Sequence, residues 1–250
     1  RISVVAAIVA RLRGAALINW TQDLFPEVAT ALGVKALKPV EPLLRALRNF
    51  SLRSARRNVV LGQRMAERIE AQGVPQDRIT IIHNWSDETQ INPIDRDANP
   101  LRRDWGLADK FVVGYSGNMG RAHEFGTIID AAERLSHRED IRFLFVGGGA
   151  QADYIVQEVG RRGLRNVDFK PYQPRRQLSY SLGAADLHLI SLQPALEGLI
   201  VPSKFYGIAA AGRPTLYIGD PKGEIPTILA QEDCGHTVRP CGSWPTFTLD

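Results

Sequence analysis

Short apolar runs alternate with segments of helical periodicity along most of the sequence, and this alternation restricts the fold more than any other feature. The runs FVVGY, FLFVG and LHLIS are apolar on both faces, which is typical of strands covered by helices on either side. Strands and helices in this order indicate parallel βαβ units with right-handed crossovers. We therefore predict an α/β chain built on parallel sheets.

The polar run NPIDRDANP, at residues 92–100, predicts a linker between two Rossmann-like units, residues 1–92 and 93–250. Because the chain opens with Arg1 inside a helical pattern and ends as abruptly, we expect the first unit to be incomplete and the second truncated at its end. Before the linker we predict strands at 15–20, 58–61 and 79–83 and helices at 41–56 and 63–72. After it we predict five strands, at 111–116, 142–147, 167–169, 186–191 and 215–218, with helices at 124–136, 152–163, 176–184 and 203–211.

The composition excludes several classes of protein. With 44% hydrophobic residues and a formal net charge of +4, the 250 residues fit neither a disordered chain nor a collagen. The two cysteines, Cys234 and Cys241, lack a histidine pattern around them, so we expect neither a zinc site nor a disulfide framework. No apolar run reaches the ~18 to 20 residues of a membrane span.

Ligands of doubly wound sheets bind at the carboxyl ends of the strands, so the loops that follow the strands are the places to search. The first loop, Ser116-Gly117-Asn118-Met119-Gly120-Arg121, has two glycines that let the backbone approach a phosphate and an arginine that adds a cation. A plain strand-to-helix turn is the alternative. The second loop, VGGGA with Gly148 at its centre, breaks the dinucleotide fingerprint and is as consistent with a tight turn as with a ligand.

The third loop, Val201-Pro202-Ser203-Lys204, leads into a helix with Ser203 at the N-cap position. A lysine in the first turn opposes the helix dipole, so Lys204 is the best single candidate for a diphosphate contact, against a solvated surface lysine. Upstream, Glu197 could accept hydrogen bonds from sugar hydroxyls or be an ordinary exposed acid. Tyr172 and Gln173, after a short strand, could hold a nucleobase or form a proline-flanked turn.

In the first part of the chain, Asp23 and Glu27 follow a strand directly, as does the run HNWSD at residues 83–87. Either acid could be a general base for a second substrate or could cap the local turn. The D-x-D of Asp95-Arg96-Asp97 lies in the linker, where we expect solvated charge and no metal. The leucine-interleaved basic segment from Arg45 to Arg57 suits anionic lipid headgroups or a lipid pyrophosphate, although a charged surface helix explains it equally well. No nucleic-acid reading module is present.

Four runs of sequence, at residues 20–27, 83–87, 115–121 and 201–214, resemble the bacterial group 1 glycosyltransferases of family GT4. The branch most similar to them is that of the fucosyl- and fucosaminyl-transferase-like enzymes of colanic acid, capsule and O-antigen synthesis. The resemblance covers nearly the whole chain. It implies a GT-B fold of two Rossmann-like domains, the N-terminal one for an acceptor and the C-terminal one for a nucleotide-sugar donor.

The resemblance also implies roles for individual residues. Gly117 and Asn118 would line the diphosphate, Arg121 and Lys204 would neutralise it, and Tyr172 with Leu178 would border the base. The remaining residues expected at the donor are Gly148, Gln173, Pro202 and Ser203, and those expected on the acceptor side are Asp23 and Glu27. The implied activity is transfer from a UDP- or GDP-sugar to a lipid-linked or glycan acceptor, with retention and without a metal, at the inner face of the bacterial plasma membrane.

The sequence departs from the family in two places. Where the family usually has a lysine shortly after its arginine, His123-Glu124-Phe125 follows Arg121. Many GT4 enzymes have two glutamates eight residues apart, and the equivalent positions here are Leu199 and Gly207. Glu197 is the carboxylate that could replace the missing hydroxyl contact. Two alternatives stay open: a GT-B-type sugar-nucleotide epimerase, and a membrane-associated nucleotide-binding module without turnover.

Overall fold

The computed structural model describes residues 2–87 and 89–241, and its contacts divide the chain into two units. The first unit runs to Asn84 and also contains Ala195–Val201. The second unit contains Trp85–Pro194 and the described residues from Pro202 onward. Each unit has a sheet in which every strand pairing is parallel, which confirms the predicted α/β class.

The first unit has a three-stranded sheet in the order β1-β2-β3. Helix α4 contributes Met65 and Ile69, four residues apart and both fully buried, to its core, and β2 contributes the fully buried Val60. The strands are β1 (Ile18–Trp20), β2 (Arg57–Val60) and β3 (Ile79–Ile81), and the helices are α1 (Ile2–Arg13), α2 (Glu27–Ala31), α3 (Glu41–Ser54) and α4 (Gln63–Glu70).

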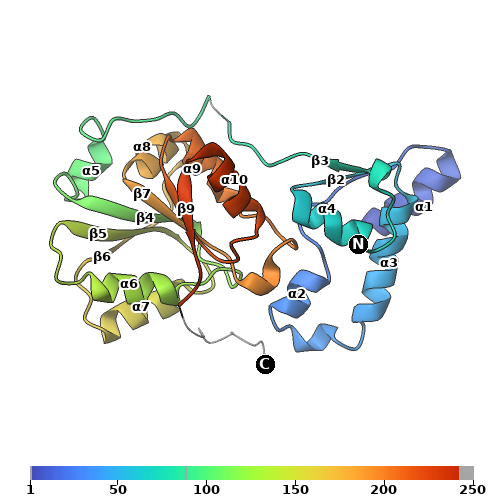
Figure 1. Ribbon diagram of the computed structural model, residues 1–250, viewed down its shortest axis with the longest axis horizontal. Helices are drawn as coiled ribbons and strands as arrows, with labels where there is room; N and C mark the ends of the chain where they lie inside the picture. Colours follow the sequence, from blue (N-terminus) through green and yellow to red (C-terminus); the bar gives the residue numbers. More distant parts are fainter. Residues whose placement is uncertain (1, 88, 242–250) are drawn as a thin grey trace. The chain divides into compact units, whose positions relative to one another are not determined.

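The second unit has six strands in the order β6-β5-β4-β7-β8-β9. This is the 3-2-1-4-5-6 order of a doubly wound sheet, in which the strand order reverses between β4 and β7. Helices α6 and α7 lie on one side of the sheet, and α8, α9 and α10 lie on the other (Figure 1). The strands are β4 (Phe111–Asn118), β5 (Ile141–Gly148), β6 (Val167–Lys170), β7 (Leu187–Ser191), β8 (Thr215–Ile218) and β9 (Gly235–Val238).

The helices of this unit are α5 (Pro100–Asp104), α6 (Gly126–Arg134), α7 (Ala152–Arg161), α8 (Leu178–Gly183), α9 (Lys204–Ala210) and α10 (Glu224–Glu232). The predicted elements agree with these to within a few residues. The prediction of five strands after the linker is wrong, because β9 adds a sixth. Helix α10 contains a proline and β9 is short and polar, so neither element has a clear hydrophobic periodicity in the sequence.

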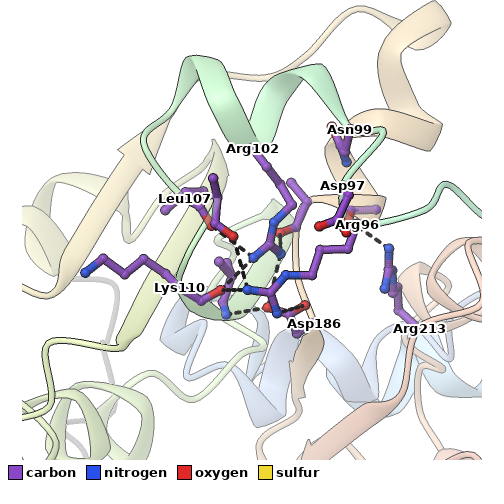
Figure 2. A network of polar contacts seen from close by, with 12 residues as sticks. Arg96, Asp97, Asn99, Arg102, Leu107, Lys110, Asp186 and Arg213 are labelled. Atoms are coloured by element: carbon purple, nitrogen blue, oxygen red, sulfur yellow. Dashed lines mark hydrogen bonds and ion pairs between the residues drawn. The ribbon is translucent and has the colours of Figure 1, made fainter.

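The linker is tied to the second unit by a polar network (Figure 2). Arg96, for which we expected solvated charge, donates to Asp186 Oδ1 at 3.3 Å and to the carbonyl oxygen of Lys110 at 2.9 Å. The side chain of Arg213 donates to the carbonyl oxygen of Ile94 at 2.7 Å. The composition of residues 92–100 thus predicts a linker, but it does not predict the specific hydrogen bonds that hold this segment in place.

Arg102 lies at the centre of the same network and is 1% exposed. Its guanidinium donates to Asp186 Oδ2 at 3.1 Å and to the carbonyl oxygens of Ala184, Leu107 and Lys110. Asp186 also accepts from the backbone N–H of Val112 at 2.7 Å, which joins the network to β4. One carboxylate thus holds the start of β4, the start of β7 and the linker together.

Candidate functional site

The carboxyl ends of β4 and β7 form the point of the second unit where ligands of doubly wound sheets bind. Gly117, at the end of β4, has φ +116°, and Gly147, opposite it at the end of β5, has φ +130°. Only glycine adopts such angles readily. The strands therefore end in backbone that lacks side chains on the side where a ligand would approach.

The two glycine loops also pack against each other too closely for side chains. A Cβ atom at Gly147 would lie 2.3 Å from the carbonyl oxygen of Gly117, and one at Gly149 would lie 2.3 Å from Asn118 Oδ1. The Met119 N–H donates to the carbonyl oxygen of Gly148 at 2.7 Å and locks the loops together. The two loops that the sequence offered separately thus form one backbone cradle.

Lys204 is the first residue of α9, as predicted, and its ammonium group lies beside this cradle. Its Nζ donates to Tyr115 Oη at 2.5 Å, and a Cβ atom at Gly117 would lie 4.0 Å from that nitrogen. Among the described residues Lys204 has no ion pair. Burial without a counter-ion lowers the pKa of Lys204 to about 7. An anion at Gly117 would supply the missing negative charge.

Arg121 lies in the loop after β4, whose backbone is held from both sides. Gln193 donates through Nε2 to the carbonyl oxygen of Arg121 at 2.8 Å, and Gln151 donates to those of Gly120 and His123. The Arg121 side chain forms no hydrogen bond or ion pair with the part of the chain that the structure describes. Its backbone is fixed and its guanidinium is available for a ligand.

Sequence reasoning missed both glutamines. Gln151 is 2% exposed, and a buried polar residue just before a helix is a signal that a search could use. Gln193 gives no such signal, since its role depends on β4 and β7 being neighbours.

His123 occupies a place where the family usually has a second cation, but it is uncharged. Its Nδ1 is 2.5 Å from the carbonyl oxygen of Ser191, so Nδ1 carries the proton. Burial, together with the charge of Lys204, lowers the pKa of His123 to about 3. The following residue, Glu124, accepts from the backbone N–H of Thr127 and caps the start of α6. Neither residue replaces the missing lysine as a charge.

Tyr172 contacts the second glycine loop. Its hydroxyl donates to the carbonyl oxygen of Gly148 at 3.1 Å, while the residue as a whole is 60% exposed. Gln173 turns back to its own loop and donates to the carbonyl oxygen of Pro171, and Leu178 begins α8. Tyr172 is thus the predicted base-binding residue that the structure brings to the cradle.

The two residues before Lys204 lie at the start of α9. Pro202 is buried, and its carbonyl oxygen accepts from the Phe205 N–H at 3.3 Å. Ser203 occupies the N-cap position of α9, as predicted, although its side chain makes no capping hydrogen bond. The Ser203 hydroxyl is exposed.

Glu197 belongs to the segment Ala195–Val201, which groups with the first unit by its contacts. Arg68 of α4 donates to the Glu197 carbonyl oxygen at 2.7 Å, and Leu24 donates through its N–H to the Leu199 carbonyl oxygen at 2.9 Å. Glu197 is 8% exposed. It is therefore not the ordinary exposed acid of the alternative interpretation.

The two acidic residues after β1 differ in their surroundings. Asp23 lines a cavity of about 670 Å³ between α1, β1 and α3, and partial burial of its carboxyl group raises its pKa. Glu27 pairs with Arg48 at 2.6 Å and with Arg45 at 3.5 Å. Asp23 is thus a partly buried acid at a cavity, whereas Glu27 is held in ion pairs.

The basic segment is also partly committed to internal contacts. Arg45 and Arg48 face Glu27 as described, Arg53 donates to the carbonyl oxygen of Gln72, and Arg57 donates to that of Asp77. Arg56 is exposed. Nowhere in residues 2–87 and 89–241 is there a helix with both the length and the apolarity to cross a bilayer.

Sequence comparison finds curated relatives that share most of this chain, whereas no protein-family model matches it. "Probable glycosyltransferase WbjE" of Pseudomonas aeruginosa is 29% identical over 233 residues, which are 92% of this chain and 58% of the relative. "Putative colanic acid biosynthesis glycosyl transferase WcaI" of Escherichia coli (strain K12) is 28% identical over 82% of this chain and 51% of its own length. The chain thus spans little more than half of these relatives.

Comparison with solved structures gives the same fold. HepE of Anabaena, solved in complex with UDP-glucose, matches with a TM-score of 0.73 at 20% identity, over 95% of this chain and 62% of HepE. WaaG, a glycosyltransferase involved in lipopolysaccharide biosynthesis, matches with a TM-score of 0.69 at 18% identity, over 90% of this chain and 62% of WaaG. These matches confirm a partial GT-B fold, and the sequence matches confirm the resemblance to GT4-type glycosyltransferases.

Proposed function

We propose that this relative of the bacterial GT4-type glycosyltransferases is part of an enzyme that transfers a sugar from a UDP- or GDP-sugar in cell-envelope glycan synthesis. The second unit binds the nucleotide-sugar donor. The first unit contributes to binding a lipid-linked or polysaccharide acceptor. Support for the donor comes from HepE, which was solved with UDP-glucose on the same fold.

The observation that carries this proposal is the uncompensated ammonium group of Lys204 beside the glycine cradle. A protein gains nothing in stability from a buried cation without a counter-ion. Backbone that is free of side chains and faces this cation is suited to the phosphates of a nucleotide. Tyr172, at the edge of the same cradle, offers an exposed ring on which a base can stack.

In the proposed reaction these groups act mainly through electrostatics. When the bond between the sugar and the diphosphate breaks, negative charge grows on the leaving phosphate oxygens. Lys204 and Arg121 stabilise that charge, and the glutamines that hold the loop keep Arg121 in place before the reaction begins. This requires neither a metal nor a covalent protein nucleophile. Retention of the anomeric configuration and the role of Glu197 toward a sugar hydroxyl belong to the same proposal.

The experiment is calorimetric titration of the chain with UDP and with GDP. Lys204→Ala and Arg121→Ala should each weaken binding of the preferred nucleotide by about 10- to 100-fold, because each removes a charge-assisted contact. Arg138→Ala is the control, since Arg138 pairs with Asp140 at the opposite, amino end of β5. Unchanged affinity in both site variants contradicts the proposal.

A second measurement separates transfer from isomerisation. The preferred UDP- or GDP-sugar is incubated with the protein without an acceptor, and the sugar is analysed for an epimer. A transferase leaves the sugar unchanged or releases it slowly to water. Accumulation of an epimer contradicts the proposed reaction while leaving the donor site intact.

A further inference from the structure

Tyr115 of β4 lies directly against the Lys204 ammonium group in two ways. Its hydroxyl accepts from Lys204 Nζ at 2.5 Å, and the same nitrogen lies 3.9 Å from the centre of the Tyr115 ring. The hydroxyl in turn donates to the carbonyl oxygen of Asn118 at 3.0 Å. One side chain thus links the lysine to the backbone of the glycine cradle.

Little else holds this lysine among the described residues. Apart from Tyr115, its only hydrogen-bond partner is the carbonyl oxygen of Asn118, at the long distance of 3.5 Å. A lysine side chain has four rotatable bonds and a strongly hydrated head, so without a partner it would turn toward water. The contact with Tyr115 is therefore what keeps the ammonium group beside Gly117.

Tyr115 itself is tightly packed. It is 1% exposed and packs with its ring centre 4.9 Å from that of Phe125 and 6.0 Å from that of Phe145. The His123 ring stands at 76° to it with centres 6.0 Å apart, and that ring is uncharged. The surroundings of Tyr115 hold the ring rigidly and add no second positive charge near Lys204.

We propose that Tyr115 is a positioning residue, which holds the Lys204 ammonium group where it meets the donor diphosphate. This rests on the proposed function of the site, which assigns Lys204 to the diphosphate. In this role Tyr115 acts through the lysine, while its other hydrogen bond, to the Asn118 carbonyl oxygen, is made with or without Lys204. The part of its contribution to nucleotide binding that runs through Lys204 must therefore disappear when Lys204 is absent.

A double-mutant cycle tests this dependence. Tyr115→Phe keeps the ring and removes the hydroxyl, which takes away the hydrogen bond from Lys204 and the one to Asn118. We expect UDP or GDP affinity to fall about fivefold or more. On a Lys204→Ala background only the bond to Asn118 is lost, so the same substitution should change affinity about twofold or less. Tyr217→Phe is the matched control, because Tyr217 is a buried tyrosine on β8 of the same sheet and its loss of hydroxyl should leave affinity unchanged.

The outcomes separate this inference from the proposed function. If Lys204→Ala weakens binding but Tyr115→Phe does not, the positioning role is wrong and the donor site stands. The role is equally wrong if Tyr115→Phe weakens binding to the same degree with and without Lys204. If Lys204→Ala leaves affinity unchanged, the positioning role is wrong, and the proposed function fails as well only if Arg121→Ala also leaves affinity unchanged.

A spectroscopic measurement on the unaltered protein avoids any problem of folding in the variant. Protons on Lys204 Cε should be shifted upfield by the Tyr115 ring, and Tyr115→Phe should broaden their signal or move it toward that of exposed lysines. A Lys204 signal at the position of exposed lysines in the unaltered protein overturns the proposal.

Discussion

At the scale of single residues, the charge of Lys204 couples protonation to the proposed binding of a nucleotide. Burial lowers its pKa to about 7, so its charge changes within the physiological pH range. A diphosphate would favour the protonated form, so the proposed binding predicts that a proton is taken up by the lysine.

We expect UDP affinity to fall as the pH rises from 7 to 9, by up to about tenfold per pH unit until the pKa of the bound state is reached. The reason is that only the protonated lysine attracts the diphosphate, which is itself fully ionised above pH 7. His123, with its pKa of about 3, stays neutral over this range and does not contribute. Calorimetry in buffers of different ionisation heat measures both the affinity and the proton uptake.

Lys204→Arg is the control for this profile, since arginine keeps its charge over the whole range. Its pH dependence should be flat. A flat profile in the unaltered protein would show that Lys204 does not titrate near neutrality.

The glycine cradle gives a second prediction at this scale. Gly149→Ala should lower the free energy of unfolding by on the order of 2 kcal/mol or more, because the residue has φ +144° and its Cβ atom would lie 2.8 Å from the Met119 nitrogen. Gly160→Ala is the control. Gly160 lies in α7 with nothing within 4 Å of its Cβ position, so alanine should stabilise by about 0.5 to 1 kcal/mol. Urea unfolding of both variants decides the comparison.

Which of these residues can be predicted from sequence depends on how local their signals are. Gly117, Asn118 and Lys204 follow strands in short motifs, so the carboxyl-end rule finds them. Tyr115 occupies an apolar strand and looks like core, and its second contact, with Lys204, joins positions 89 residues apart. Such a contact becomes visible only when the strand order is known.

At the scale of secondary-structure elements, the network around Asp186 joins the linker to the sheet (Figure 2). We expect Asp186→Asn to lower the free energy of unfolding of the second unit by about 3 to 5 kcal/mol, because it leaves the fully buried Arg102 guanidinium without its negative partner. Asp140→Asn is the control, since its ion pair with Arg138 is exposed and should contribute nothing measurable. If urea unfolding shows that both variants lower the free energy of unfolding equally, burial of Arg102 does not determine the strength of its ion pair.

The elements themselves follow the sequence where a strong pattern exists. The strands β4, β5 and β7 are continuous apolar runs and were predictable, whereas β9 reads GHTV and alternates between partly buried and exposed residues. A short strand of this kind is stabilised by its pairing with β8 and not by its own pattern. The anchoring of the linker has no such pattern either, because Arg96 donates to the backbone carbonyl oxygens of Ala108 and Lys110, beyond the linker itself.

At the scale of the whole chain, composition and the restart of the strand-helix alternation predict a boundary between residues 92 and 93, whereas the contacts change from one unit to the other between Asn84 and Trp85. Nothing in the sequence predicts that Ala195–Val201 belongs to the first unit, since this segment lies between two elements of the second unit. Gly198 in this segment has a positive φ, and a side chain at its position would collide with Arg68. The placement of the segment in the first unit therefore depends on tertiary packing, which no local sequence pattern predicts.

The first unit also exposes an apolar surface on α1 and α3, made by Val5, Ile8, Val9, Leu12, Leu43, Leu47 and Phe50, with Leu12 80% exposed. Arg11, Arg13 and Arg56 are exposed cations of the same unit. Apolar side chains together with arginines favour the interface of an anionic membrane. We therefore expect the chain to sediment with vesicles containing phosphatidylserine and far less with neutral ones.

Replacing Arg11, Arg13 and Arg56 together by glutamate should weaken binding to the anionic vesicles at least about tenfold, since each arginine near such a surface contributes about 1 kcal/mol. The matched control replaces Arg103, Arg138 and Arg175, which are exposed on the second unit and change the net charge equally. Because salt screens the attraction, and the Debye length becomes roughly threefold shorter between about 0.05 and 0.5 M salt, binding of the unaltered chain should also fall steeply over this range. If both triple variants weaken binding to the same extent, net charge governs the interaction and the first unit has no membrane-binding surface of its own.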